Sequence, residues 1–157
     1  MSAHDLVLKS MNEMAAKFSQ AGHSLQMPPH SNSALGTQYI DLTMGTMLEA
    51  RIPYDLRYTN PLLGYQGGFL CAALDDVYGP LTYMSAERPV VTIEMSTSFI
   101  RPFHAKDEFV TIKAEVVTKT KALIFLKAEV RSREGKLIAT STNHSMIIQE
   151  QNAGLSR

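Results

Sequence analysis

Two adjacent aspartates interrupt an apolar run in the middle of the chain. The run, FLCAALDDVY, spans residues 69–78 and contains Asp75 and Asp76. Aspartate is unfavourable inside a helix, and a buried carboxylate is costly unless it is paired or hydrogen-bonded. Side chains of adjacent helical residues point about 100° apart, so these two cannot share one role. One of them can reach solvent or a cation while the other faces a pocket, where a carboxylate could do chemistry, and the local sequence leaves open which is which.

A polar turn and a glycine pair come before this run. Asn60 precedes Pro61, which is typical of a turn, and Gly67 and Gly68 stand where the predicted helix begins. The N-terminus of a helix has unsatisfied backbone N–H groups and a positive dipole, which stabilise a developing oxyanion. Asn60 can equally be a simple turn residue, and the glycines can be a flexible helix entry.

The segments before this region predict a helix and one or two strands. Apolar residues at helical spacing predict an amphipathic helix of about four turns that begins near Asp5. Residues 23–34 are rich in Ser, Pro, His and Asn and predict a loop. Residues 37–53 are strand-like but broken at Gly45, which indicates a bent strand or two short ones.

Alternating apolar and polar residues in the second half predict four strands. They lie at residues 91–99, 110–116, 124–131 and 137–148. Short connections between them predict an antiparallel meander with one solvated face. Because one apolar helix needs a cover, the predicted fold is α+β, a hotdog in which a curved antiparallel sheet wraps around one long central helix, with an extra N-terminal helix.

Length and composition are those of a single globular domain. We predict an N-terminal helix and loop over 1–34, one hotdog domain over 35–150 and a flexible tail over 151–157. The 157 residues carry 15 Lys+Arg and 15 Asp+Glu, so a basic field for nucleic acid is absent. The single cysteine excludes an internal disulfide, and no metal-ligand spacing is present, so we predict no metal and no cofactor. Neither a signal peptide nor a membrane span is indicated, so we expect a cytoplasmic protein without a membrane partner.

The stretch NPLLGYQGGFLCAALD, from Asn60 to Asp75, resembles the hotdog-fold acyl-CoA thioesterases of the phenylacetate-degradation type. Their motif runs N-x-x-x-x-x-H-G-G-x-x-x-x-x-x-D. Asn60 stands six positions before Gln66, and Asp75 follows nine positions after it. The resemblance continues through VVTIEMSTSFIRPF and REGKLIATSTNHSMII and covers roughly residues 35–148.

This resemblance implies hydrolysis of an acyl-CoA to a free acid and CoA. It selects Asp75 over Asp76 as the catalytic carboxylate, acting as general base or as nucleophile. It also implies that the Gly67 N–H stabilises the oxyanion and that Asn60 assists at the thioester carbonyl. Thr92 would help Asp75 to hold the attacking water. The alternative is that Thr92 is an ordinary β-branched strand residue without a catalytic role.

Gln66 departs from the family pattern, which has histidine at this position. Glutamine donates and accepts hydrogen bonds but cannot shuttle a proton near neutral pH. We expect turnover to survive, because a CoA thiolate leaves readily without protonation, with Gln66 and Gly68 contacting substrate. The alternative is a non-catalytic hotdog protein that binds acyl-CoA. Hotdog hydratases use a different, His-centred motif that is absent from the central helix.

The spacing of the two key groups predicts a site shared by two subunits. Gly67 and Asp75 are eight residues apart, or about 12 Å along a helix, so one thioester carbonyl cannot easily contact both in one chain. The family's arrangement implies Gly67 and Asn60 from one subunit and Asp75 and Thr92 from the other, in a homodimer or homotetramer. The candidate contacts to the CoA phosphates are basic residues in or beside loops: Arg101, Lys119 and Lys121.

Overall fold

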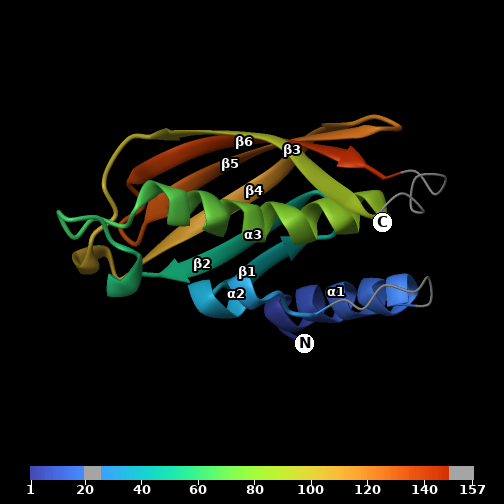
Figure 1. Cartoon of the computed structure of the whole chain (residues 1–157), viewed down its shortest axis with the longest axis horizontal. Helices are drawn as coiled ribbons and strands as arrows, with labels where there is room; N and C mark the ends of the chain where they lie inside the picture. The colour runs from blue at the N-terminus through green and yellow to red at the C-terminus, as the bar shows by residue number, and fades with distance from the viewer. Residues whose placement is uncertain (20–25, 149–157) are drawn as a thin grey trace.

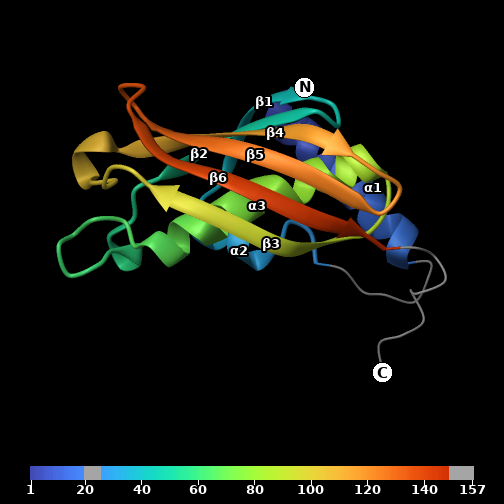
Figure 2. The same ribbon diagram turned by 90° about the horizontal axis from the view of Figure 1, so that it is seen from above.

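A curved antiparallel sheet wraps around one long helix in the computed structural model, which describes residues 1–19 and 26–148 (Figures 1 and 2). The long helix is α3 (Gly67–Ala86). Helix α1 (Ala3–Ser19) packs against β1 and α3, and the short α2 (His30–Leu35) packs against α3. The predicted hotdog fold with its extra N-terminal helix is confirmed. Within the described residues, no helix is both long and apolar enough to cross a membrane.

The sheet has six strands in the order β1-β2-β4-β5-β6-β3. Their bounds are β1 Gln38–Thr43, β2 Met47–Pro53, β3 Val90–Phe99, β4 Phe109–Lys119, β5 Leu123–Ser132 and β6 Leu137–Ile147. The predicted meander is wrong for β3, which pairs with β6 and forms an edge of the sheet (Figure 2). Alternation of side chains shows which face of a strand is buried, but it does not say which strand lies beside it.

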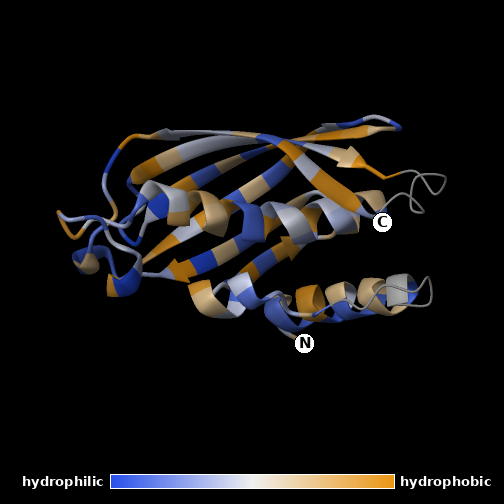
Figure 3. Ribbon diagram, in the orientation of Figure 1, coloured by the Kyte–Doolittle hydropathy of each residue, from blue (hydrophilic) through white to orange (hydrophobic). Residues whose placement is uncertain are grey.

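The core lies between α3 and the inner face of the sheet. Val77 and Leu81 of α3 are fully buried, and so are Ile112 of β4 and Val130 of β5. Along β4 and β5 buried apolar residues alternate with exposed polar ones, which is visible as alternating colours in Figure 3. Burial of this apolar surface fixes the helix against the sheet and so fixes where the residues of α3 point.

Helix α3 is longer than the apolar run FLCAALDDVY and continues through Gly79 and Pro80 to Ala86. Pro80 has no N–H for the carbonyl of Asp76, and the hydroxyl of Tyr39 donates to that carbonyl instead, at 3.1 Å. Gly79 has no Cβ to clash with the proline ring that follows it. A donor from another element therefore lets the helix continue past a residue that normally ends it.

The segment before the sheet also differs from its prediction. The loop predicted over residues 23–34 is wrong from His30 onward, where α2 begins, while residues 20–25 lie outside the described ranges. Helix α2 ends at Gly36, which has the left-handed φ of 66°. Residues 37–53 form two short strands, one of the two predicted alternatives, joined by a turn at Gly45. The predicted tail, 151–157, also lies outside the described residues.

Candidate active site

The carboxylate of Asp75 meets the edge strand of the sheet. Asp75 is exposed in the middle of α3, and Thr92 is exposed near the start of β3. The Thr92 hydroxyl donates to Asp75 Oδ1 at 3.0 Å. This contact orients the carboxylate and leaves its second oxygen for another donor, such as a water. An exposed, oriented carboxylate can act as a general base or as a nucleophile.

The neighbouring Asp76 has a structural environment. Its Oδ1 accepts from the Ser31 hydroxyl at 2.8 Å, and its Oδ2 accepts from the Thr37 hydroxyl at 3.2 Å. Burial raises the pKa of Asp76, and these two hydrogen bonds oppose that rise. Both carboxylate oxygens are therefore engaged in holding α2 and the start of β1 against α3. The two aspartates point into different surroundings, as expected from their 100° separation.

Gln66 caps the N-terminus of α3. Its Oε1 accepts from the backbone N–H of Phe69 at 3.1 Å, which is the usual N-cap contact. A Cβ on Gly68 would lie 2.9 Å from that oxygen, so the glycine leaves room for the folded-back side chain. Gln66 thus has a structural role that the sequence analysis did not foresee. Its amide nitrogen is still a donor at the mouth of the helix.

Gly67 is the first residue of α3, and its backbone N–H has no acceptor within the part of the chain that the structure describes. A Cβ on Gly67 would lie 3.0 Å from the ring of Phe99, near the end of β3. The helix N-terminus therefore lies beneath this exposed aromatic ring. An N–H at this position can donate to an anionic oxygen that approaches beside the ring.

The structure gives Asn60 the role of a turn residue. Its Oδ1 accepts from the backbone N–H groups of Leu62 and Gly64, at 2.9 and 3.1 Å. Leu63 has a left-handed φ of 59°. Its N–H donates to the Asn60 carbonyl, and its own carbonyl accepts from the Tyr54 hydroxyl at 2.7 Å. Only the side-chain amide nitrogen of Asn60 is left for a substrate.

Two half-sites lie along one edge of the molecule. Asp75 and Thr92 form one, and Gly67 with Phe99 forms the other; Gly67 and Asp75 are eight positions apart on an unbroken helix. The β3 edge that runs past both carries exposed apolar side chains, including Val91, Ile93, Phe99 and Ile100 just beyond the strand. The structure of one chain therefore does not bring the predicted catalytic residues together at one point.

The three basic residues are also separated. Arg101 follows the end of β3 near Gly67 and donates to the carbonyl of Leu137 at 2.8 Å. Lys119 contacts the carbonyl of Ser85 near the opposite end of α3, and Lys121 lies in the nearby turn between β4 and β5. These residues cannot form a single phosphate site within one chain. No group of three His, Cys, Asp or Glu side chains in residues 1–19 and 26–148 is arranged to hold a metal.

The sequence analysis missed a buried polar row on the inner face of β6. Ser141, Asn143 and Ser145 are buried there, and Ser145 is the register partner of Thr92. The Asn143 Nδ2 and the Tyr78 hydroxyl have no hydrogen-bond partner in the described part of the chain. The sequence does indicate this polar row, because in STNHS the residues that face the core are polar as well as those that face outward. The sheet is therefore polar directly behind the Asp75–Thr92 contact.

Comparison with known proteins confirms the resemblance to hotdog thioesterases. Residues 67–139, from the start of α3 to β6, match the family model of the thioesterase superfamily. No curated protein sequence matches the chain. A phenylacetic acid degradation-related protein from Ralstonia eutropha has 27% identity and a TM-score of 0.70, over 83% of this chain and 98% of that one.

Two further solved structures share the fold. PaaI from the phenylacetic acid degradation operon of Escherichia coli is 19% identical, with a TM-score of 0.72 over 87% of this chain and 96% of that one. The thioesterase HI1161 from Haemophilus influenzae is 19% identical, with a TM-score of 0.73 over 81% of this chain and 88% of that one. At this identity the similarity is one of fold.

Proposed function

We propose that this hotdog-fold chain, similar from α3 to β6 to the thioesterase superfamily, hydrolyses acyl-CoA thioesters with Asp75 as the reacting carboxylate. The observation that carries the proposal is the hydrogen bond from Thr92 to Asp75. It orients an exposed carboxylate on a helix whose other side is the buried core. Asp76, by contrast, has both oxygens engaged by Ser31 and Thr37, which argues against a catalytic role for it.

Two routes are compatible with this geometry. In the first, Asp75 takes a proton from a water whose oxygen attacks the thioester carbonyl; the C–S bond then breaks and CoA leaves as a thiolate. In the second, an oxygen of Asp75 attacks the carbonyl carbon, the C–S bond breaks and CoA leaves as a thiolate, and water then hydrolyses the resulting anhydride to release the acid and the Asp75 carboxylate. In both, the N–H of Gly67 donates to the oxyanion that forms on the carbonyl oxygen. The Gln66 amide, held by its cap, would be a neutral donor beside it.

Pairing of two β3 edges would complete the site. Thr92 contacts Asp75, and Phe99 lies over Gly67, so two points on β3 correspond to the two half-sites. An antiparallel β3 pair centred midway between these points would put Thr92 opposite Phe99 of the partner subunit. Asp75 would then face Gly67 of the partner subunit. This supports a homodimer, or a homotetramer of two such dimers, with two sites at each β3–β3 interface.

The adjacent aspartates provide the experiment. We expect Asp75→Asn to lower the rate of CoA release from an acyl-CoA panel by at least ~100-fold with little change in melting temperature. Asp76→Ala should keep turnover within a few-fold but lose about 1–3 kcal/mol of stability, because Ser31 and Thr37 lose their acceptor. Full turnover in Asp75→Asn would sink the proposal.

The second candidate function is acyl-CoA binding without turnover. It is favoured by Gln66, because an amide cannot protonate a leaving group. Wild-type protein that binds acyl-CoA by calorimetry but releases no CoA would support this function. In that case Gln66→His is the variant in which turnover would be sought.

A further inference from the structure

We propose that the acyl group extends from Asp75 along α3, past Gly79, into a cleft between α1 and α3, and that the substrates are unbranched aliphatic acyl-CoAs of medium length. The inference rests on the proposed function, since it takes Asp75 as the place of the thioester carbonyl. It adds a specific acyl-binding site, formed in part by the N-terminal helix.

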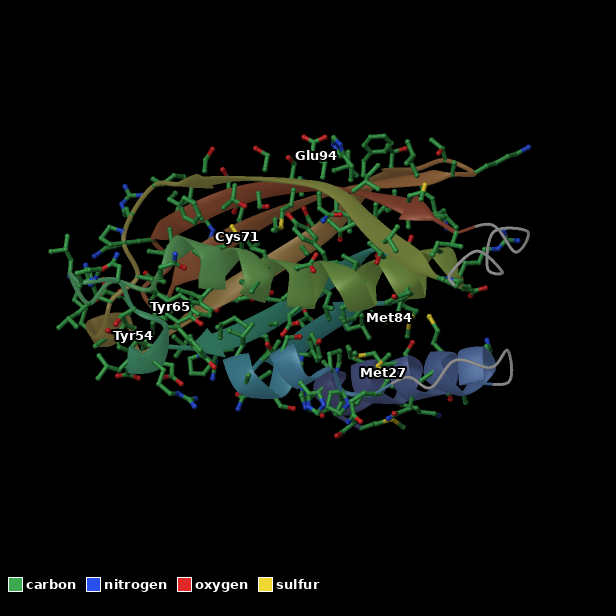
Figure 4. All side chains as sticks on the ribbon, in the orientation of Figure 1. Met27, Tyr54, Tyr65, Cys71, Met84 and Glu94 are labelled. Carbon is green, nitrogen blue, oxygen red and sulfur yellow. The ribbon has the colours of Figure 1, made fainter. Side chains whose placement is uncertain are left out.

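The cleft is a cavity of about 70 Å³ between the two helices. Its lining is mainly apolar and consists of Ser10, Met11, Met14 and Ala15 from α1, Met27, and Pro80 and Tyr83 from α3. Figure 4 shows Met27 in the layer between α1 and α3. An apolar cavity of about 150 Å³ holds a benzene ring, so this one suits the end of a chain better than a ring. Methionine side chains can also rearrange around chains of different length.

One side of α3 connects Asp75 with this cleft. Asp75, Gly79 and Tyr83 are four residues apart in succession, so they lie along the same side of the helix. Burial and, secondarily, the charge of Asp75 raise the pKa of Tyr83, consistent with this placement. Gly79 precedes Pro80 and leaves this side of α3 without a side chain. A Cβ added to Gly79 would meet no atom within 4 Å, so the space beside it is open. An acyl chain can therefore lie against the helix backbone between the carboxylate and the cleft.

The helix spacing sets the length of the chain. Pro80 and Tyr83 are five and eight residues beyond Asp75, or about 7.5 to 12 Å along the axis. An extended alkyl chain advances about 1.3 Å per carbon, given C–C bonds of about 1.5 Å, so about six to nine carbons reach the cleft. An acetyl group is too short to enter, and a phenylacetyl group ends in a ring that is too wide.

Two neighbouring alanines of α1 allow a matched test. Ala15 lines the cleft, whereas Ala16 is exposed on the same helix. Binding of acetyl-, octanoyl- and phenylacetyl-CoA would be measured by calorimetry in an Asp75→Asn background, which prevents turnover. We expect octanoyl-CoA to bind at least about tenfold more tightly than acetyl-CoA, because each buried methylene is worth roughly fourfold in affinity. Ala15→Phe should abolish this preference by filling the cleft, and Ala16→Phe should preserve it.

A second variant covers the case in which Ala15→Phe does not fold. Met14→Ala enlarges the cleft, so it should shift the preference from octanoyl- to dodecanoyl-CoA. The proposal is overturned if phenylacetyl-CoA binds more tightly than octanoyl-CoA. It is also overturned if both α1 variants leave the chain-length preference unchanged.

Wild-type kinetics separate this inference from the proposed function. If octanoyl-CoA binding depends on Ala15 but no CoA is released, the acyl site stands and hydrolysis fails. If CoA is released from every substrate with a chain-length profile that Ala15→Phe does not alter, hydrolysis stands and the acyl site fails.

Discussion

At the scale of single residues, Gly67 contributes a backbone N–H that a proline can remove. Gly67 is the first residue of α3, where proline is favoured, and Gln66 before it has φ −71° and ψ 135°, which proline tolerates. Gly67→Pro should therefore preserve the helix and delete the donor, while it also adds a Cβ beside the Phe99 ring. If this N–H stabilises the oxyanion, steady-state release of CoA should show kcat lowered by about 10²- to 10³-fold.

Gly67→Ala is the control for this prediction. It brings a Cβ to the same place, 3.0 Å from the exposed Phe99 ring, but keeps the N–H. We expect kcat to stay within about tenfold of wild type, since one oxyanion donor accounts for the larger effect. Equal losses in both variants would mean that crowding of Phe99 is responsible.

The resemblance indicated Asp75 and Thr92 together, but the sequence did not indicate the partners of Asp76. The motif spacing pointed to Asp75, and the structure places Thr92 against it, 17 positions away in the chain. The partners of Asp76 could not be predicted, because Ser31 and Thr37 are 45 and 39 positions away, the first in a predicted loop and the second at the start of a predicted strand. The Gln66 cap was predictable in principle, since a helix that begins at Gly67 needs a residue that accepts from its first turn.

At the scale of elements, one tyrosine joins β1, α2 and α3. The Tyr39 hydroxyl donates to the Asp76 carbonyl that Pro80 leaves without a donor, and it accepts from Asn32 Nδ2 at 2.9 Å. Tyr39→Phe should lower the free energy of unfolding by about 1–3 kcal/mol, because buried groups lose their partner. Urea denaturation followed by circular dichroism measures the change.

Tyr78→Phe provides the comparison within α3. Tyr78 is fully buried, and its hydroxyl has no hydrogen-bond partner among the residues described. Removing that hydroxyl should leave stability unchanged or raise it, because an unsatisfied polar group is removed from the core. A loss as large as that of Tyr39→Phe would show that the neighbouring Ser141 hydroxyl or an ordered water completes the Tyr78 site.

Element types were predictable, whereas their lengths and neighbours were less so. The alternation in β4 and β5 reports burial directly, since one face of each strand packs on α3. The end of α3 was not predictable, because the donor that compensates for Pro80 comes from β1. The edge position of β3 depends on its pairing with β6, which lies some 50 residues further along the chain.

At the scale of the whole molecule, two inactive variants can test whether subunits share a site. A heterodimer of Asp75→Asn and Gly67→Pro would contain one site with both mutations and one with neither. If the two variants are co-expressed and pair at random, half of the dimers are heterodimers, each with one intact site of two. The mixture should therefore have about a quarter of wild-type activity. CoA release by the co-expressed proteins is measured, and a different affinity tag on each variant verifies that heterodimers have formed.

Absence of recovery in verified heterodimers would place Gly67 and Asp75 in separate sites. The composition of the chain could suggest self-association only weakly, through its zero net charge. The exposed apolar side chains of β3 are a stronger indication, and they became visible only once β3 was seen to be an edge.

The adjacency of Asp75 and Asp76 also constrains which changes of chain length α3 can accept. A one-residue insertion or deletion between Gly67 and Asp75 would rotate the helix by about 100° relative to its start. A deletion would turn Asp76 towards Thr92 in place of Asp75. An insertion would turn Asp76 away from Ser31 and Thr37. Substitutions on the exposed face can accumulate one at a time, whereas the nine residues from Gly67 to Asp75 must keep their number.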